Sequence, residues 1–187
     1  SILAHQTIAA LLVSSNRVNE AQIYLDRLLD LEGDAAKFFM QLNNLLARSA
    51  NKIETLQLVQ QFAKPYSEVP EAHFAIAQAA SLAGQFETAR QQMKLALTLR
   101  PDWEMAAIYN GRLLRHHVSS ESAIEFYQSY LKVNPKANKA RIAFAQMLVA
   151  EKNFIMARGQ FKQLLAQSLG DANVAIAVGL LSIELRD

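Results

Sequence analysis

The sequence predicts an all-α fold in which antiparallel helix pairs stack in series as an α-solenoid. Glycine and proline are scarce, with 6 and 4 among 187 residues, as expected where short turns join helices. Pro101 and Pro135 lie 34 residues apart, and similar turn signals return at this interval along the chain. Small residues recur at two fixed positions of the repeated unit, as expected where two helix backbones come close together.

The 34-residue interval divides the chain into five complete units and one partial unit. Their predicted ranges are 2–35, 36–69, 70–103, 104–137, 138–171 and 172–187. We expect residues 1–187 to form a single domain. Because the sequence begins and ends inside a helical pattern, we also expect this domain to belong to a longer protein.

Each complete unit is predicted to hold two helices joined by a turn of three or four residues, which makes neighbouring helices antiparallel. The first helices are expected at 2–14, 36–49, 70–83, 104–117, 138–151 and 172–185. The second helices are expected at 19–31, 53–64, 87–99, 121–133 and 155–167. Side chains with the chemistry of helix N-caps are Asp34, Asp102, Ser119, Ser120, Asn153 and Asp171.

Small residues mark the expected contact points between helices. The eighth residue of a unit is Ala9, Ala77, Gly111, Ala145 or Gly179, and the twentieth is Ala21, Ala89, Ala123 or Ala157. The unit 36–69 departs from this rule with Asn43 and Thr55, and we interpret it as a degenerate repeat that the fold tolerates. Large apolar residues at helical spacing predict the core: Ile8, Leu42, Ile76 and Phe144, then Leu25, Val59, Met93, Tyr127 and Phe161, then Leu28, Phe62, Tyr130 and Leu164.

Composition argues against several classes of partner. The 19 basic and 17 acidic residues leave a net charge of only +2, which is too small to predict binding to nucleic acid or to an anionic membrane. The absence of cysteine excludes disulfides and thiolate metal sites. No apolar stretch approaches the roughly 20 residues of a membrane-spanning helix, so no insertion into a membrane is expected.

No motif in the sequence predicts catalysis, a cofactor or a metal. Ser49 and Lys52 have the spacing of a nucleophilic serine motif, but they fall in a predicted turn without the partner motifs. His116 and His117 are adjacent on a helix, where neighbouring side chains point about 100° apart, so they are poorly placed to share a metal. We interpret His5 and His73 as packing residues at helix interfaces and predict that the chain is not an enzyme.

The turn and contact residues resemble those of the tetratricopeptide repeat family. The resemblance is carried by Gly84, Ala89, Ala96 and Pro101 in one unit and by Gly111, Ala123, Tyr127 and Pro135 in the next. The family usually has tryptophan early in the first helix, where this chain has His5, Phe39, His73, Ala107 and Arg141. The general character of the sequence also resembles large tetratricopeptide repeat proteins of Gram-negative bacteria. This resemblance implies a location in the bacterial periplasm or at a membrane, with the cytoplasm as the alternative.

The resemblance implies a right-handed superhelix whose first helices line a concave groove that binds a peptide or protein. Carried over by position, the groove is expected to contain Lys37, Asn44, Arg48, Phe74, Gln78, Ile108, Arg112, Arg115, Lys139, Ile142 and Gln146. Because arginine and lysine lie among apolar residues in this set, the expected partner carries carboxylates.

Two other functions are compatible with the same repeats. The chain could be the substrate-recruiting arm of a longer enzyme, of the glycosyl- or sulfo-transferase type, or an oligomerisation module. The helix expected at 172–185 has no second helix after it in this sequence, so one apolar flank would lack a partner. Exposed apolar surface of this kind predicts self-association through residues 172–187.

Overall fold

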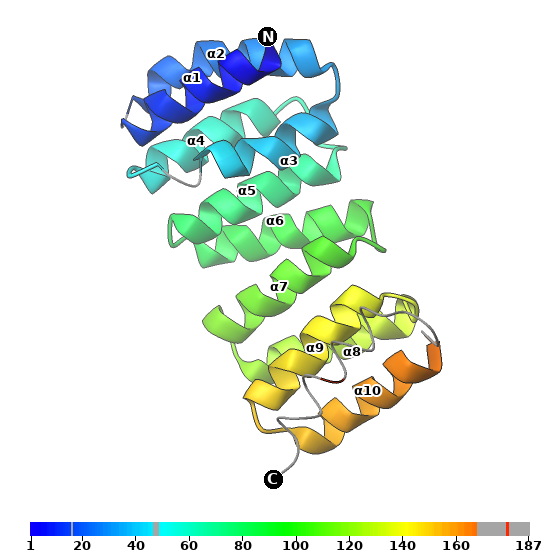
Figure 1. Cartoon of the computed structure of the whole chain (residues 1–187). Helices are drawn as coiled ribbons and strands as arrows, with labels where there is room; N and C mark the ends of the chain where they lie inside the picture. Colours follow the sequence, from blue (N-terminus) through cyan, green and yellow to red (C-terminus); the bar gives the residue numbers. More distant parts are fainter. Residues whose placement is uncertain (16, 47–48, 168–178, 180–187) are drawn as a thin grey trace. The chain divides into compact units, whose positions relative to one another are not determined.

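The computed structural model describes residues 1–15, 17–46, 49–167 and 179, in which there are ten α-helices and no strand (Figure 1). The predicted all-α class is therefore confirmed. The chain divides into two compact units, unit 1 from Ser1 to Pro101 and unit 2 from Asp102 to Asp187, and each is described by itself. The prediction of a single domain with a continuous superhelix stays a prediction. No helix in the described residues has the length and apolar character needed to cross a bilayer.

Unit 1 contains six helices that follow one another in the order of the three predicted repeats. Its helices are α1 (Ile2–Ser14), α2 (Val18–Glu32), α3 (Ala35–Leu46), α4 (Lys52–Ala63), α5 (Pro70–Leu82) and α6 (Phe86–Leu99). Helix α1 packs against α2, and α5 packs against α6. Helix α3 contacts both α1 and α5, so first helices lie next to one another as the repeat predicts (Figure 1).

Unit 2 repeats this arrangement with two pairs. Its helices are α7 (Glu104–His117), α8 (Ser120–Val133), α9 (Asn138–Ala150) and α10 (Phe154–Gln167). Helix α7 packs against α8 and α9, and α9 also packs against α8 and α10. The contact between α7 and α9 joins the two first helices of the unit, and it positions the candidate site described below.

Most predicted helix ends are confirmed to within one residue, since they are set by local turn chemistry. The helix expected at 36–49 ends at Leu46, and the one expected at 172–185 lies outside the described residues apart from Gly179. Asp34, Ser119 and Asn153 accept backbone N–H hydrogen bonds of 3.2, 3.1 and 3.4 Å, as N-caps do. The prediction was wrong for Asp102 and Ser120, because Trp103 precedes α7 and Ser120 already lies inside α8. Asp171 lies outside the described residues.

The small residues occupy buried contact points between helices. The buried set comprises Ala9, Ala21, Ala77, Ala89, Gly111, Ala123, Ala145 and Ala157. Gly179 is exposed, and the Asn43 side chain lies outside the described part. Thr55 is buried in the degenerate unit, where its hydroxyl donates to the Asn51 carbonyl at 2.8 Å. The hydrogen bond offsets the cost of burying this hydroxyl, which explains how the fold tolerates the departure.

The predicted apolar core is largely confirmed. Leu25, Leu42, Met93, Phe144 and Leu164 are fully buried. The prediction was wrong for Ile8, which is 38% exposed. It lies on α1, the first helix of unit 1, where no preceding helix of the described chain packs beside it.

Candidate functional site

The predicted groove residues fall into both units of the structure. Unit 1 contains Lys37 and Asn44 on α3 and Phe74 and Gln78 on α5; unit 2 contains Ile108, Arg112 and Arg115 on α7 and Lys139, Ile142 and Gln146 on α9. Arg48 lies outside the described residues. On each helix the residues are three, four or seven positions apart, so they share one face of that helix.

In unit 1 the predicted residues do not form one exposed surface. Lys37 and Asn44 are exposed, and the Lys37 ammonium lies 3.7 Å from the Asp34 carboxylate. Phe74 is only 3% exposed, so its ring belongs to the core and not to a surface that a partner could contact. Helix α5 packs against α3, α4 and α6, in keeping with the burial of Phe74.

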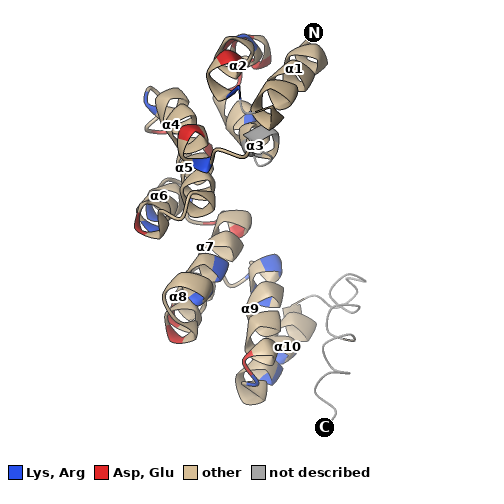
Figure 2. Cartoon of the chain, turned by 90° about the vertical axis from the view of Figure 1, so that its left-hand side faces the viewer, with Lys and Arg blue, Asp and Glu red and all other residues tan. Residues whose placement is uncertain are grey.

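Unit 2 brings three predicted residues together around one cavity. Arg112, Arg115 and Gln146 line a cavity of about 150 Å³ between α7 and α9. Its other walls are Gly111, Tyr127, Ala143 and Met147. Both helices carry lysine or arginine positions, coloured blue on the ribbon in Figure 2. We call the surface formed by Ile108, Arg112, Arg115, Lys139, Ile142 and Gln146 the α7–α9 face.

Tyr127 forms the floor of this cavity. Because Gly111 has no Cβ, the Tyr127 ring lies directly against the backbone of α7, in the space that a side chain at position 111 would fill. The ring stacks on Phe144 with centroids 5.1 Å apart, and its hydroxyl donates to the Ile108 carbonyl at 3.3 Å. Burial raises the pKa of Tyr127 to about 12, and the positive charge of Arg112 opposes that shift. The Tyr127 side chain at the base of the cavity is therefore uncharged, and its position is fixed by the Phe144 ring and the Ile108 carbonyl.

The two arginines of the α7–α9 face differ in their electrostatic surroundings. The Arg115 Nε–H donates to a Glu151 carboxylate oxygen at 2.7 Å, so its charge is compensated within the unit. Arg112 is exposed and has no ion pair among the described residues. Lys139 is also exposed, whereas Ile108 and Ile142 are half-buried. The sequence analysis expected a basic groove here, and it did not identify Glu151 as the partner of Arg115. Arg112 and Lys139 are therefore the cations of the α7–α9 face that have no ion pair among the described residues.

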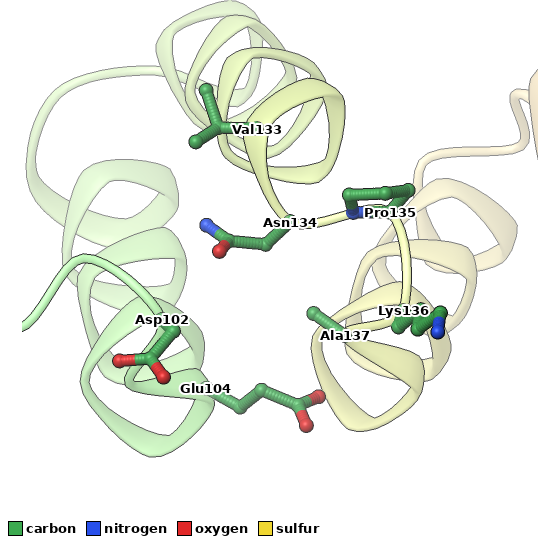
Figure 3. Close-up of a pocket in the computed structure, with 7 residues that line it drawn as sticks. All are labelled: Asp102, Glu104, Val133, Asn134, Pro135, Lys136 and Ala137. Carbon is green, nitrogen blue, oxygen red and sulfur yellow. The ribbon is translucent and has the colours of Figure 1, made fainter.

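A second cavity, of about 360 Å³, lies where α7, α8 and α9 meet at the other end of α7 (Figure 3). The Glu104 side chain extends toward α9, where it accepts the Ala140 backbone N–H at 2.9 Å. A carboxylate at the first turn of a helix satisfies an N–H that would otherwise lack a partner. Glu104 is thus engaged in holding α7 to α9, and no group of three or more potential metal ligands occurs in the described residues.

Two tyrosines of α8 provide a test of this packing. The Tyr130 hydroxyl is buried and has no hydrogen-bond partner in the described part of the chain, whereas the Tyr127 hydroxyl has one. We expect Tyr130→Phe to raise the free energy of unfolding by about 1 kcal/mol and Tyr127→Phe to lower it by about 1 kcal/mol. Chemical denaturation of both variants measures the difference, and two changes of the same sign would contradict the structure.

The sequence comparison supports the fold on which this site is built. Residues 70–102 match the model of the tetratricopeptide repeat family. This segment is a tetratricopeptide repeat. The resemblance that the sequence predicted is therefore confirmed, and the repeat covers α5 and α6 of unit 1. No curated protein matches the sequence.

Solved tetratricopeptide repeat structures share the fold of the chain at low sequence identity. TTC0263 from Thermus thermophilus is 13% identical with a TM-score of 0.63, and the alignment covers 98% of this chain and 100% of that one. MamA is 15% identical with a TM-score of 0.57, covering 90% and 94%. YrrB, described as a tetratricopeptide repeat protein with an unusual peptide-binding site, is 18% identical with a TM-score of 0.51, covering 87% and 85%. These likenesses establish the fold alone.

Proposed function

We propose that the chain is a non-enzymatic scaffold that binds an acidic peptide segment of a protein partner on the α7–α9 face. The observation that carries the proposal is the cavity beside Arg112, a cation that is exposed and has no ion pair in the described residues. Tetratricopeptide repeats are, as a fold, suited to protein–protein interaction, and YrrB is described as having a peptide-binding site. The location of the site and the acidity of the partner are our inference.

The shape and chemistry of the face favour a short extended or helical segment. A cavity of about 150 Å³ accommodates one side chain, and half-buried Ile108 and Ile142 add apolar surface beside it. Gln146 supplies an amide that can donate to or accept from a peptide backbone. Arg112 and Lys139 then favour a carboxylate next to the anchoring side chain. Because both cations are exposed, we expect binding to weaken as salt is raised.

A charge reversal tests the proposal. We expect Arg112→Glu to lower the affinity for acidic peptides about tenfold or more, because an attraction becomes a repulsion at the cavity. The measurement is selection of a random peptide display library on the wild-type chain, followed by titration of the selected peptides against each variant. The matched control is Arg158→Glu, which reverses an exposed arginine on α10 that does not line this cavity.

The selection has a clear contrary result. Wild-type protein should enrich sequences with aspartate or glutamate, and Arg158→Glu should bind them as the wild type does. Peptides without acidic residues, or peptides that bind the folded Arg112→Glu variant unchanged, would reject the α7–α9 face as the site. The predicted self-association through residues 172–187 concerns residues outside the described part and remains a separate prediction.

A further inference from the structure

A larger polar cavity lies on another side of unit 2. It has a volume of about 530 Å³ and is formed by α8, the start of α9 and α10. Four glutamines line it, Gln128 from α8 and Gln160, Gln163 and Gln167 from α10, together with Lys132. Since none of these residues belongs to the α7–α9 face, this cavity is a distinct feature, which we call the Arg141 pocket.

Arg141 lies in this pocket with a charge that no carboxylate of the described residues balances. The side chain is only 3% exposed. Its guanidinium donates to the Gln160 side-chain oxygen at 3.0 Å, to the Gln163 side-chain oxygen, and to the Pro135 carbonyl at 2.8 Å. All three acceptors are neutral, and no ion pair to Arg141 occurs in the described residues. Its Nε–H is buried and has no partner within the described part of the chain.

Unit 1 shows that packing alone does not require this charge. His73 precedes Arg141 by two repeats of 34 residues and occupies the same position of its first helix. One ring nitrogen lies 2.7 Å from the Gln92 side-chain oxygen and the other 2.9 Å from the Ser67 carbonyl. The separations of 19 and 6 residues equal those from Arg141 to Gln160 and to Pro135. A neutral histidine can make both contacts when Nε2–H donates to the Ser67 carbonyl and the Gln92 amide turns its N–H₂ group toward Nδ1. The arginine adds donors and a buried charge beyond these two contacts.

An unbalanced buried charge is costly unless an anion approaches it. Burial lowers the pKa of Arg141, in the direction expected when a cation loses its hydration. In unit 1 the buried Glu71 carboxylate is paired with Arg100, whereas within residues 1–15, 17–46 and 49–167 Arg141 contacts glutamine and carbonyl oxygens. The glutamine amides can rotate to present N–H₂ groups to an anion, and Lys132 adds a second cation at the wall.

We propose that the Arg141 pocket binds a carboxylate of a peptide ligand, separately from the α7–α9 face. A carboxylate carries one negative charge, which matches the single buried guanidinium, and its two oxygens suit the paired N–H groups of arginine. The ligand carboxylate is either an acidic side chain or the free carboxyl terminus of a chain. Both present the same group, and the pocket is large enough for the residue that carries it.

The test follows the Arg141 Nε–H signal by NMR in the full ¹⁵N-labelled chain, assigned by its loss in Arg141→Lys. The probes are the blocked peptides Ac-Ala-Ala-Glu-Ala-Ala-NH₂ and Ac-Ala-Ala-Gln-Ala-Ala-NH₂, and Ac-Ala₅ with a free or an amidated C-terminus. We expect a saturable shift, with a Kd of about 1 mM, for peptides that bear a carboxylate and none for their neutral partners. A shift with the glutamate peptide but not the glutamine peptide shows that the pocket binds a side-chain carboxylate. A shift with free but not amidated Ac-Ala₅ shows that it binds a terminal carboxylate.

A second variant places the carboxylate in the chain itself. Gln163 lies at the exposed edge of the Arg141 pocket and already contacts the Arg141 guanidinium. In Gln163→Glu the new carboxylate would pair with this guanidinium, so we expect a higher melting temperature and peptide binding that is at least tenfold weaker. Gln91→Glu adds the same charge on α6, outside the pocket, and should do neither. Unchanged binding to folded Gln163→Glu would overturn the proposal, as would equal shifts from neutral peptides or from sulfate.

Discussion

Replacement of Gly111 by alanine is expected to destabilise unit 2 by about 2 kcal/mol. A Cβ at position 111 would collide with the Tyr127 ring. This ring cannot move aside freely, because it is buried and stacked on Phe144. Overpacking costs about 1–3 kcal/mol, and we take the upper end because the Cβ would meet an enclosed ring. Subtracting the roughly 1 kcal/mol that alanine gains over glycine inside a helix leaves a net loss of about 2 kcal/mol.

The matched control is Gly159→Ala on α10. Gly159 is exposed, and a Cβ there would meet no atom within 4 Å, so only the helix propensity changes and stability should rise by about 1 kcal/mol. Chemical denaturation followed by fluorescence of Trp103, the only tryptophan of the chain, reports on unit 2. Equal effects of the two substitutions would mean that Gly111 is not a contact point between helices.

Phe144→Ala is expected to lower the free energy of unfolding by about 3–5 kcal/mol. The Phe144 side chain is fully buried, and its ring supports Tyr127 from α9. It also lines the Arg141 pocket, so its removal leaves a void beneath both candidate sites. Phe144→Leu refills most of the volume and should recover more than half of the loss.

The same denaturation experiment measures this pair of variants. A loss below about 1 kcal/mol for Phe144→Ala would show that the ring is not an essential part of the unit 2 core. Because repeats contact only their neighbours, the loss should fall on the unit 2 transition when the two units unfold separately.

The architecture was predictable from the sequence because its determinants are local and repeat. Gly84 adopts φ of +75° just after the end of α5, a conformation that favours glycine and stops a helix. The 34-residue interval then predicts where the later helices begin and end. The buried alanines were predictable for the same reason, since the close approach of two helices permits only a small side chain. The N-cap prediction failed for Asp102 because α7 begins one residue later than an Asp102 cap would require, so Trp103 occupies the N-cap position. The sequence shows which side chains can cap a helix, but not which residue lies at the cap position.

The site was only partly predictable because its chemistry depends on contacts between elements. Phe74, Ile108 and Ile142 occupy equivalent positions, yet the first is enclosed and the others are half-buried. The Arg115–Glu151 pair joins residues 36 positions apart, and nothing local marks it. In the sequence, Arg141 stands out only because it replaces the tryptophan that the tetratricopeptide repeat family usually has at this position. The separation of 19 residues to a glutamine, which it shares with His73, is a signal that could have identified its partner.

The claim that the α7–α9 face binds the partner is tested most directly by site-specific photo-crosslinking. A p-benzoylphenylalanine replaces Gln146, which lines the cavity, or Gln91, which is exposed on α6, and each protein is irradiated with an acidic peptide selected on the wild-type chain. We predict a covalent adduct from position 146, suppressed by Arg112→Glu, and none from position 91. An adduct from position 91 with none from position 146 would contradict the claim.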